Sequence, residues 1–94
     1  MIIKIFELCG SFAENKDIAR EIREKKIKSN LKDEGNLFVL DFDGVDASTQ
    51  SFIHALISGF FQKYGEKALK WFEFQNCNPT IKTLIATVIN YSLE

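Results

Sequence analysis

Apolar residues recur along this chain in two alternating patterns, short apolar runs and stripes with helical spacing. Three segments are rich in β-branched or aromatic residues and are predicted strands: Ile2–Leu8, Leu37–Phe42 and Lys70–Gln75. Leu37–Phe42 is a nearly continuous apolar run, which is typical of a strand that is covered on both faces of its sheet. We therefore expect it to be the most buried of the three.

An amphipathic helix is predicted after the first strand, which Cys9-Gly10-Ser11 breaks. Asn15 is suited to cap this helix, and Asp17 in its first turn is favourable near the positive end of the helix dipole. Ser11 and Glu14 form a competing capping box. The helix carries one narrow apolar stripe, so we expect it to cover one face of the core and to expose the other to water.

Two further helices are predicted from the same rules. The first runs from about Thr49 to Lys63 with a wide apolar face, and Gly65 is well placed as the left-handed residue just beyond it. The last helix begins with Asn78 as its cap and Pro79 at its first helical position.

The resulting order is β-α-β-α-β-α in a single domain spanning residues 1–94. Such alternation predicts the α/β class: a small, mostly parallel sheet with packed helices and right-handed crossovers. Functional residues in such sheets collect at the carboxyl ends of the strands. In this chain those ends are Cys9-Gly10-Ser11, Asp41–Thr49 and Asn76–Thr80.

Composition narrows the functional classes. A net charge of −1 does not indicate a nucleic-acid partner. The cations between Arg20 and Lys32, interleaved with acidic residues, are typical of a solvated helix face and loop, and the alternative is a weak contact with an anion. No apolar run is long enough to span a bilayer, and no signal peptide precedes the first strand. Cys9 and Cys77 form no CxxC pair, so we expect free thiols in a cytoplasmic protein without zinc or another cofactor.

The acidic turn after the second strand has one catalytic interpretation. Asp41-Phe42-Asp43-Gly44-Val45 resembles the first motif of haloacid-dehalogenase-type phosphatases, which implies Asp41 as nucleophile and Asp43 as acid/base around a Mg²⁺-bound phosphate. No acidic pair follows the third strand to hold such a metal ion. An EF-hand loop is a weaker alternative, because its twelfth position would be Phe52 instead of Glu.

The same turn has a second interpretation, as part of a signalling module. Four segments together resemble the STAS-like family of small bacterial domains, whose relatives include anti-sigma-factor antagonists: Asp17–Arg23, Val39–Val45, Thr49–Ile53 and the last strand with its Pro-capped helix. The resemblance extends from about Ile3 to Ile89 and is closest to the subfamily described as a domain of unknown function. It implies a STAS-like fold and a non-catalytic role in binding a partner protein.

The resemblance also implies a site in the loop and helix after the second strand. In antagonist relatives, a histidine-kinase-like ATPase phosphorylates a hydroxyl at this helix start, and phosphorylation changes partner binding. Here the segment is Asp46-Ala47-Ser48-Thr49-Gln50-Ser51-Phe52, without the glycine that those relatives carry. The predicted partner-binding or switch residues are Asp43, Asp46, Ser48, Thr49 and Ser51, and the candidate phospho-acceptors are Ser48, Thr49 and Ser51. A simpler interpretation is that Ser48 or Thr49 only caps the helix.

The remaining chemically notable residues are predicted to be structural. His54 is expected to be a partly exposed helix residue, since Ser51 is the only local nucleophile that it could activate. Trp71 is expected to pack in the core or at the sheet edge. Phe60 and Phe61 are not both expected to be buried, and Cys9 is expected to be a buried structural thiol.

Overall fold

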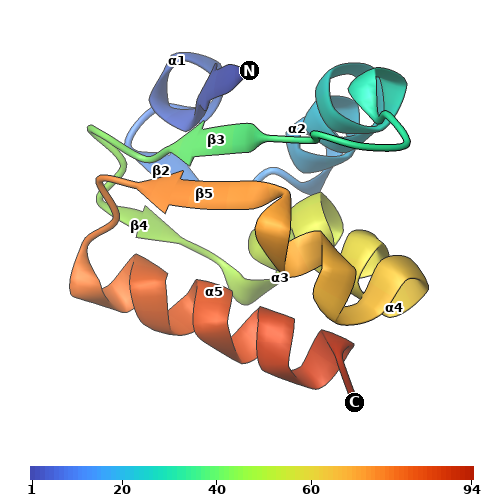
Figure 1. The fold of residues 1–94 in the computed structure, drawn as a ribbon. Coiled ribbons are helices and arrows are strands. Elements are labelled where there is room, and N and C mark those ends of the chain that lie inside the picture. The colour runs from blue at the N-terminus through green and yellow to red at the C-terminus, as the bar shows by residue number, and fades with distance from the viewer.

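The computed structural model describes residues 1–94 and places a parallel sheet at the centre of the fold (Figure 1). Its strands are β1 (Ile2–Lys4), β3 (Phe38–Asp41) and β5 (Phe72–Gln75), in the spatial order β1-β3-β5. Both pairings are parallel, so the predicted parallel α/β sheet is confirmed. The central strand is β3, the predicted buried run, and at its carboxyl end Asp41 lies between Lys4 and Gln75.

A second, smaller sheet was not predicted. It pairs β2 (Phe12–Ala13) with β4 (Ala47–Ser48), again in parallel. Each strand has two residues, which is too short for an alternating apolar pattern to mark it in the sequence. This sheet joins the segment after the first helix to the segment that precedes the candidate site.

The predicted first strand, Ile2–Leu8, is wrong in its second half, where α1 (Ile5–Cys9) forms a short helix. Ile5 is fully buried and Cys9 packs against the core, which places two core contacts four residues apart. Phe6 and Leu8 remain exposed. A short apolar run fits both strand and helix periodicity, and here helical spacing fits the core better.

The helix after α1 follows its predicted start. Asn15 caps α2 (Lys16–Glu21), and its Oδ1 accepts hydrogen bonds from the backbone N–H groups of Asp17 and Ile18 at 2.9 and 3.3 Å. The competing cap at Ser11 is not used. The helix continues as the π-helical segment η1 (Ile22–Ile27) and ends in the short 3₁₀ segment η2 (Lys28–Asn30).

The helix predicted from Thr49 to Lys63 is present as three consecutive segments: α3 (Gln50–Ile53), the π-helical η3 (His54–Ser58) and α4 (Gly59–Tyr64). Gly65 ends it with φ of 64° and opens the 3₁₀ segment η4 (Gly65–Lys70), which replaces the start of the predicted third strand.

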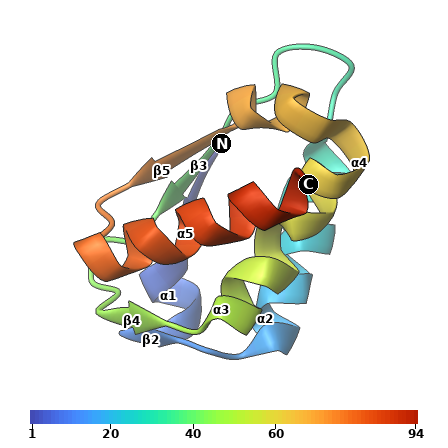
Figure 2. The same ribbon diagram turned by 90° about the horizontal axis from the view of Figure 1, so that it is seen from below.

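The last helix, α5 (Pro79–Ser92), begins at its predicted cap, since Asn78 Oδ1 accepts a hydrogen bond from the backbone N–H of Ile81 at 2.9 Å. It lies across the sheet alongside α3 and α4 (Figures 1 and 2). No helix of the chain has both the length and the apolar character needed to cross a membrane.

The core is a single cluster of 23 buried apolar residues. Phe60 and Phe61 are both buried, at 5% and 1% exposure, so the expectation that only one would be buried is wrong. Both rings contact Phe72 of β5, with centroid distances of 5.6 and 5.8 Å. The buried face of this helix is therefore wide enough to include both side chains. Trp71 is buried as expected.

Candidate functional site

The acidic turn, Asp41–Asp46, is held by its own first carboxylate. Asp41 Oδ1 accepts hydrogen bonds from Asn76 Nδ2 and from the backbone N–H of Asp43, both at 2.9 Å. The Asn76 hydrogen bond, followed by that of Asp43 and the charge of Lys4, lowers the pKa of Asp41, while partial burial opposes the shift. The carboxylate therefore connects the ends of β3 and β5.

Gly44 shapes the second half of this turn. Its φ is 87°, and a Cβ atom there would lie 2.9 Å from Cδ2 of Phe6 on α1. The position therefore requires glycine for two reasons, the left-handed backbone and the close approach of an aromatic ring. Val45 is buried beneath the turn, while the side chains of Asp43 and Asp46 are exposed.

The catalytic interpretation requires further metal ligands near Asp41 and Asp43. Asp41 and Asp43 line a shallow depression with Lys4, Phe6 and Glu7, but no group of three or more His, Cys, Asp or Glu side chains is arranged to hold a metal ion. The EF-hand alternative is wrong, because Asp41 ends strand β3 and Phe52, at its twelfth position, is fully buried.

Asp46 is fixed through its backbone. Its N–H donates to the carbonyl oxygen of Ser11 at 2.8 Å, and its own carbonyl accepts from Asn78 Nδ2 at 2.7 Å. Asn78, the cap residue of α5, therefore also fixes the backbone just before β4. The carboxylate of Asp46 is left exposed at a defined position beside the start of α5.

The three candidate hydroxyls have different environments. Ser48 is half-buried, and its Oγ donates to the carbonyl oxygen of Ala13 at 2.8 Å across the small sheet. Thr49 is the N-cap of α3, where its Oγ1 accepts from the backbone N–H of Phe52 at 3.1 Å. Ser51 is exposed, and its hydroxyl makes no hydrogen bond. The capping interpretation therefore holds for Thr49, and Ser51 alone presents a free hydroxyl.

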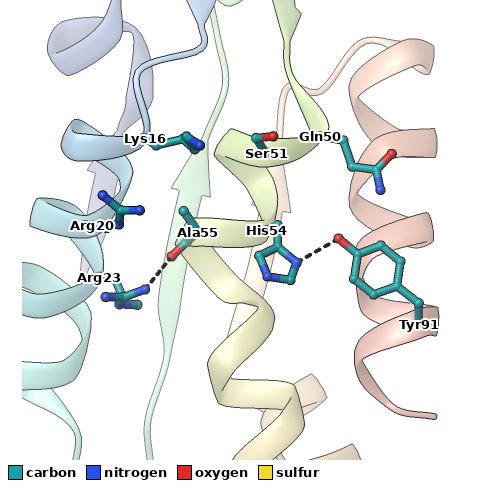
Figure 3. A pocket seen from close by; sticks show the side chains of 8 residues that line it. All are labelled: Lys16, Arg20, Arg23, Gln50, Ser51, His54, Ala55 and Tyr91. Carbon is teal, nitrogen blue, oxygen red and sulfur yellow. Dashed lines mark hydrogen bonds between the residues drawn. The ribbon is translucent and has the colours of Figure 1, made fainter.

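Ser51 lines an open groove that lies over α3–η3, with α2–η1 on one side and α5 on the other (Figure 3). The groove has a volume of about 730 Å³. Its lining residues are Lys16, Arg20, Arg23, Gln50, Ser51, His54, Ala55 and Tyr91. Three of these are cations and none is acidic, and we call this feature the basic groove.

The cations of the basic groove were not predicted as part of the site. Arg20 and Arg23 belong to the run that was expected to be a solvated helix face. The sequence does contain a signal for them, since Lys16, Arg20 and Arg23 follow the i, i+4, i+7 spacing that places residues on one face of a helix. Only the packing of α2 beside α3 shows that this face lies opposite Ser51.

His54 is exposed, as expected, and its Nδ1 lies 2.9 Å from the hydroxyl oxygen of Tyr91 on α5 (Figure 3). The two rings are stacked with centroids 5.7 Å apart. His54 makes no hydrogen bond to Ser51, so the two side chains do not form a nucleophile–base pair.

The two cysteines, Cys9 and Cys77, are free and half-buried. Burial raises the pKa of each thiol, which lowers the thiolate fraction at neutral pH. Cys9 is thus less buried than expected, and the direction of its pKa shift agrees with a structural thiol.

Fold and site together define a small α/β domain with a parallel sheet, and Thr49 and Ser51 lie where the second long helix begins. The family model described as a STAS-like domain of unknown function (DUF4325) matches residues 19–82, which is more than half of the chain. The chain therefore belongs to this STAS-like family, as its sequence resemblance indicated. Comparisons with curated proteins and with solved structures found no match.

Proposed function

We propose that this STAS-like domain is a non-catalytic signalling module that binds a partner protein through the loop and helix start after β3. Membership of a STAS-like family supports the non-catalytic part of this proposal. The observation that carries it is the free hydroxyl of Ser51, exposed in the first turn of α3 and faced by cations of α2. Asp43 and Asp46 add two exposed carboxylates on the loop that precedes this helix.

Ser51 is the phospho-acceptor that we propose within this surface. The hydroxyls of Ser48 and Thr49 already make hydrogen bonds that hold β4 and the start of α3. A phosphate on Ser51 would add about −1.5 to −2 charges near the N-terminus of a helix, where negative charge is favourable. The modification would then change the charge that a partner meets without unfolding the helix.

The partner that the family resemblance implies is a histidine-kinase-like ATPase, and the experiment uses an ATPase of this class from the source organism. The purified ATPase with ATP should add one phosphate, which mass spectrometry should locate at Ser51. Ser51→Ala should abolish this incorporation, and Ser48→Ala should retain it if the variant folds.

Binding is tested separately by calorimetry between the two proteins. Ser51→Asp and Asp46→Lys should each weaken binding at least about fivefold, a typical size for a charge change at an interface. Gln62→Glu adds the same charge as Ser51→Asp at an exposed position of α4 and serves as the matched control. Equal affinity of Ser51→Asp, Asp46→Lys and the control would refute the proposed surface.

A further inference from the structure

The basic groove has features of a ligand site that a solvated helix face does not need. Lys16 and Arg20 are a like-charge pair at i, i+4, and such pairs disfavour the helix that carries them. Both nevertheless lie on the side of α2 that faces another helix (Figure 3). The chain contains 13 acidic residues, but none lines this groove. The groove lining therefore carries positive charge, although two of its cations, Arg20 and Arg23, also contact carboxylates outside it.

The cations keep unused donors. Arg20 Nη1 contacts Asp17 Oδ1 at 3.1 Å, and Arg23 Nε contacts Glu24 Oε2 at 3.5 Å. Arg23 Nη1 also donates to the carbonyl oxygen of Ala55 at 3.1 Å, which fixes the guanidinium against the floor of the groove. A guanidinium has five N–H donors, so both arginines retain free N–H groups, and Lys16 has no ion-pair partner.

The middle of the groove, formed by α3–η3, supplies neutral polar groups. The Ser51 hydroxyl is free, and the hydrogen bond to Tyr91 holds the imidazole of His54 in a fixed orientation, with its Nε2 atom unpaired. The groove's volume of about 730 Å³ falls within the range typical of small-molecule sites, roughly 300–1,000 Å³. Three cations on one side and neutral hydrogen-bonding groups beside them match a ligand with several acceptor oxygens and more than one negative charge.

We propose that the basic groove binds a small phosphate-bearing ligand, whose phosphate is held by Lys16, Arg20 and Arg23 and faces Ser51 and His54. Guanidinium groups match the oxygens of a phosphate with paired hydrogen bonds, and a phosphate carries more charge and more acceptors than a single carboxylate. This proposal concerns the isolated chain and does not depend on the proposed partner protein.

The probe is inorganic pyrophosphate, titrated into the isolated chain at constant ionic strength. Calorimetry should show saturable binding, and NMR shift changes should cluster at the amides of residues 16–23 and 50–55. The double variant Lys16→Gln/Arg20→Gln should weaken binding at least about tenfold, in line with the loss of charge-assisted hydrogen bonds. Lys67→Gln/Lys70→Gln removes the same charge from exposed positions of η4 and should change the affinity less than about twofold.

Ser51→Asp is a second variant that places a negative charge inside the groove and keeps every cation. It should also weaken pyrophosphate binding, whether or not the double variant folds. Absence of saturable binding, or equal losses in the two double variants, would refute the site. Citrate, a tricarboxylate, should bind more weakly than pyrophosphate, and equal affinity would overturn the assignment to phosphate.

Discussion

The acidic turn and the basic groove are joined by the short segment from Asp46 to Ser51, yet they use their polar groups in opposite ways. In the turn, the carboxylate of Asp41 and the backbone of Asp46 are hydrogen-bonded to residues that hold the sheet and the start of α5. In the groove, the Ser51 hydroxyl and several guanidinium N–H groups remain free. The first carboxylate of the more conspicuous motif is thus structural, whereas the less conspicuous basic groove has several unused hydrogen-bond donors.

Strand β4 separates these two regions. Its pairing with β2 engages the Ser48 hydroxyl and sets the point at which Thr49 caps α3. Ser51, in the first turn of this helix, then lines the basic groove together with cations of α2. A short sheet therefore decides which hydroxyl of the cluster is available.

The largest expected effect tests the structural role of the acidic turn. Gly44→Ala should lower the free energy of unfolding by about 1–3 kcal/mol. The backbone of residue 44 has a positive φ, which disfavours alanine, and the added Cβ atom would lie against the Phe6 ring. Chemical denaturation measures this loss. Gly59→Ala is the matched control, since Gly59 is helical with open space around it, and it should raise stability by up to about 1 kcal/mol. Equal effects of the two substitutions would mean that the turn is not constrained.

A smaller effect is expected at the boundary between the two regions. Thr49→Ala removes the side-chain cap of α3 and should lower stability by about 1 kcal/mol, whereas Thr49→Ser keeps the hydroxyl and should lose less. Thermal denaturation of both variants gives the comparison. A loss as large for serine as for alanine would show that Thr49 acts by packing and not as a cap. Under the phosphate-site proposal, pyrophosphate affinity should change little in Thr49→Ser.

The sequence predicted the parts of this fold that depend on local chemistry. The caps at Asn15 and Asn78 and the end of a helix at Gly65 are each set by neighbouring residues, and they are confirmed. The three-stranded parallel sheet was predicted from the alternation of strand-like and helical segments along the chain. Family resemblance then indicated the STAS-like class, which the family match confirms.

The features that were predicted wrongly or not at all depend on contacts between residues far apart in the sequence. Residues Ile5–Cys9 form a helix because of how Ile5 and Cys9 meet the core, and a short apolar run cannot reveal this. The small β2–β4 sheet joins segments far apart in the sequence. The basic groove depends in the same way on the packing of α2 beside α3. The sequence also could not single out Ser51, because the hydrogen bonds that engage Ser48 and Thr49 depend on the folded backbone.

The smallest expected effect concerns pH and the charge of Asp41. Because the pKa of this carboxyl is lowered in the folded state, the charged form stabilises the fold above the pKa of the unfolded chain, and this contribution is lost as pH falls through the folded value. Asp41→Asn keeps the shape and an acceptor oxygen but removes the charge. The variant should be less stable than the native chain at neutral pH, and the difference should shrink below the ordinary carboxyl pKa of 3.8.

Melting temperatures of both proteins between neutral pH and about pH 2 measure this difference across the ordinary carboxyl range. Asp33→Asn is the control, because Asp33 is exposed and makes no hydrogen bond or ion pair, so its difference from the native chain should stay small at every pH. A constant deficit for Asp41→Asn across the range would mean that geometry alone, and not charge, joins β3 to β5. A shrinking deficit would show that the ionised carboxylate stabilises the turn, which is the structural role that distinguishes Asp41 from the unpaired groups of the basic groove.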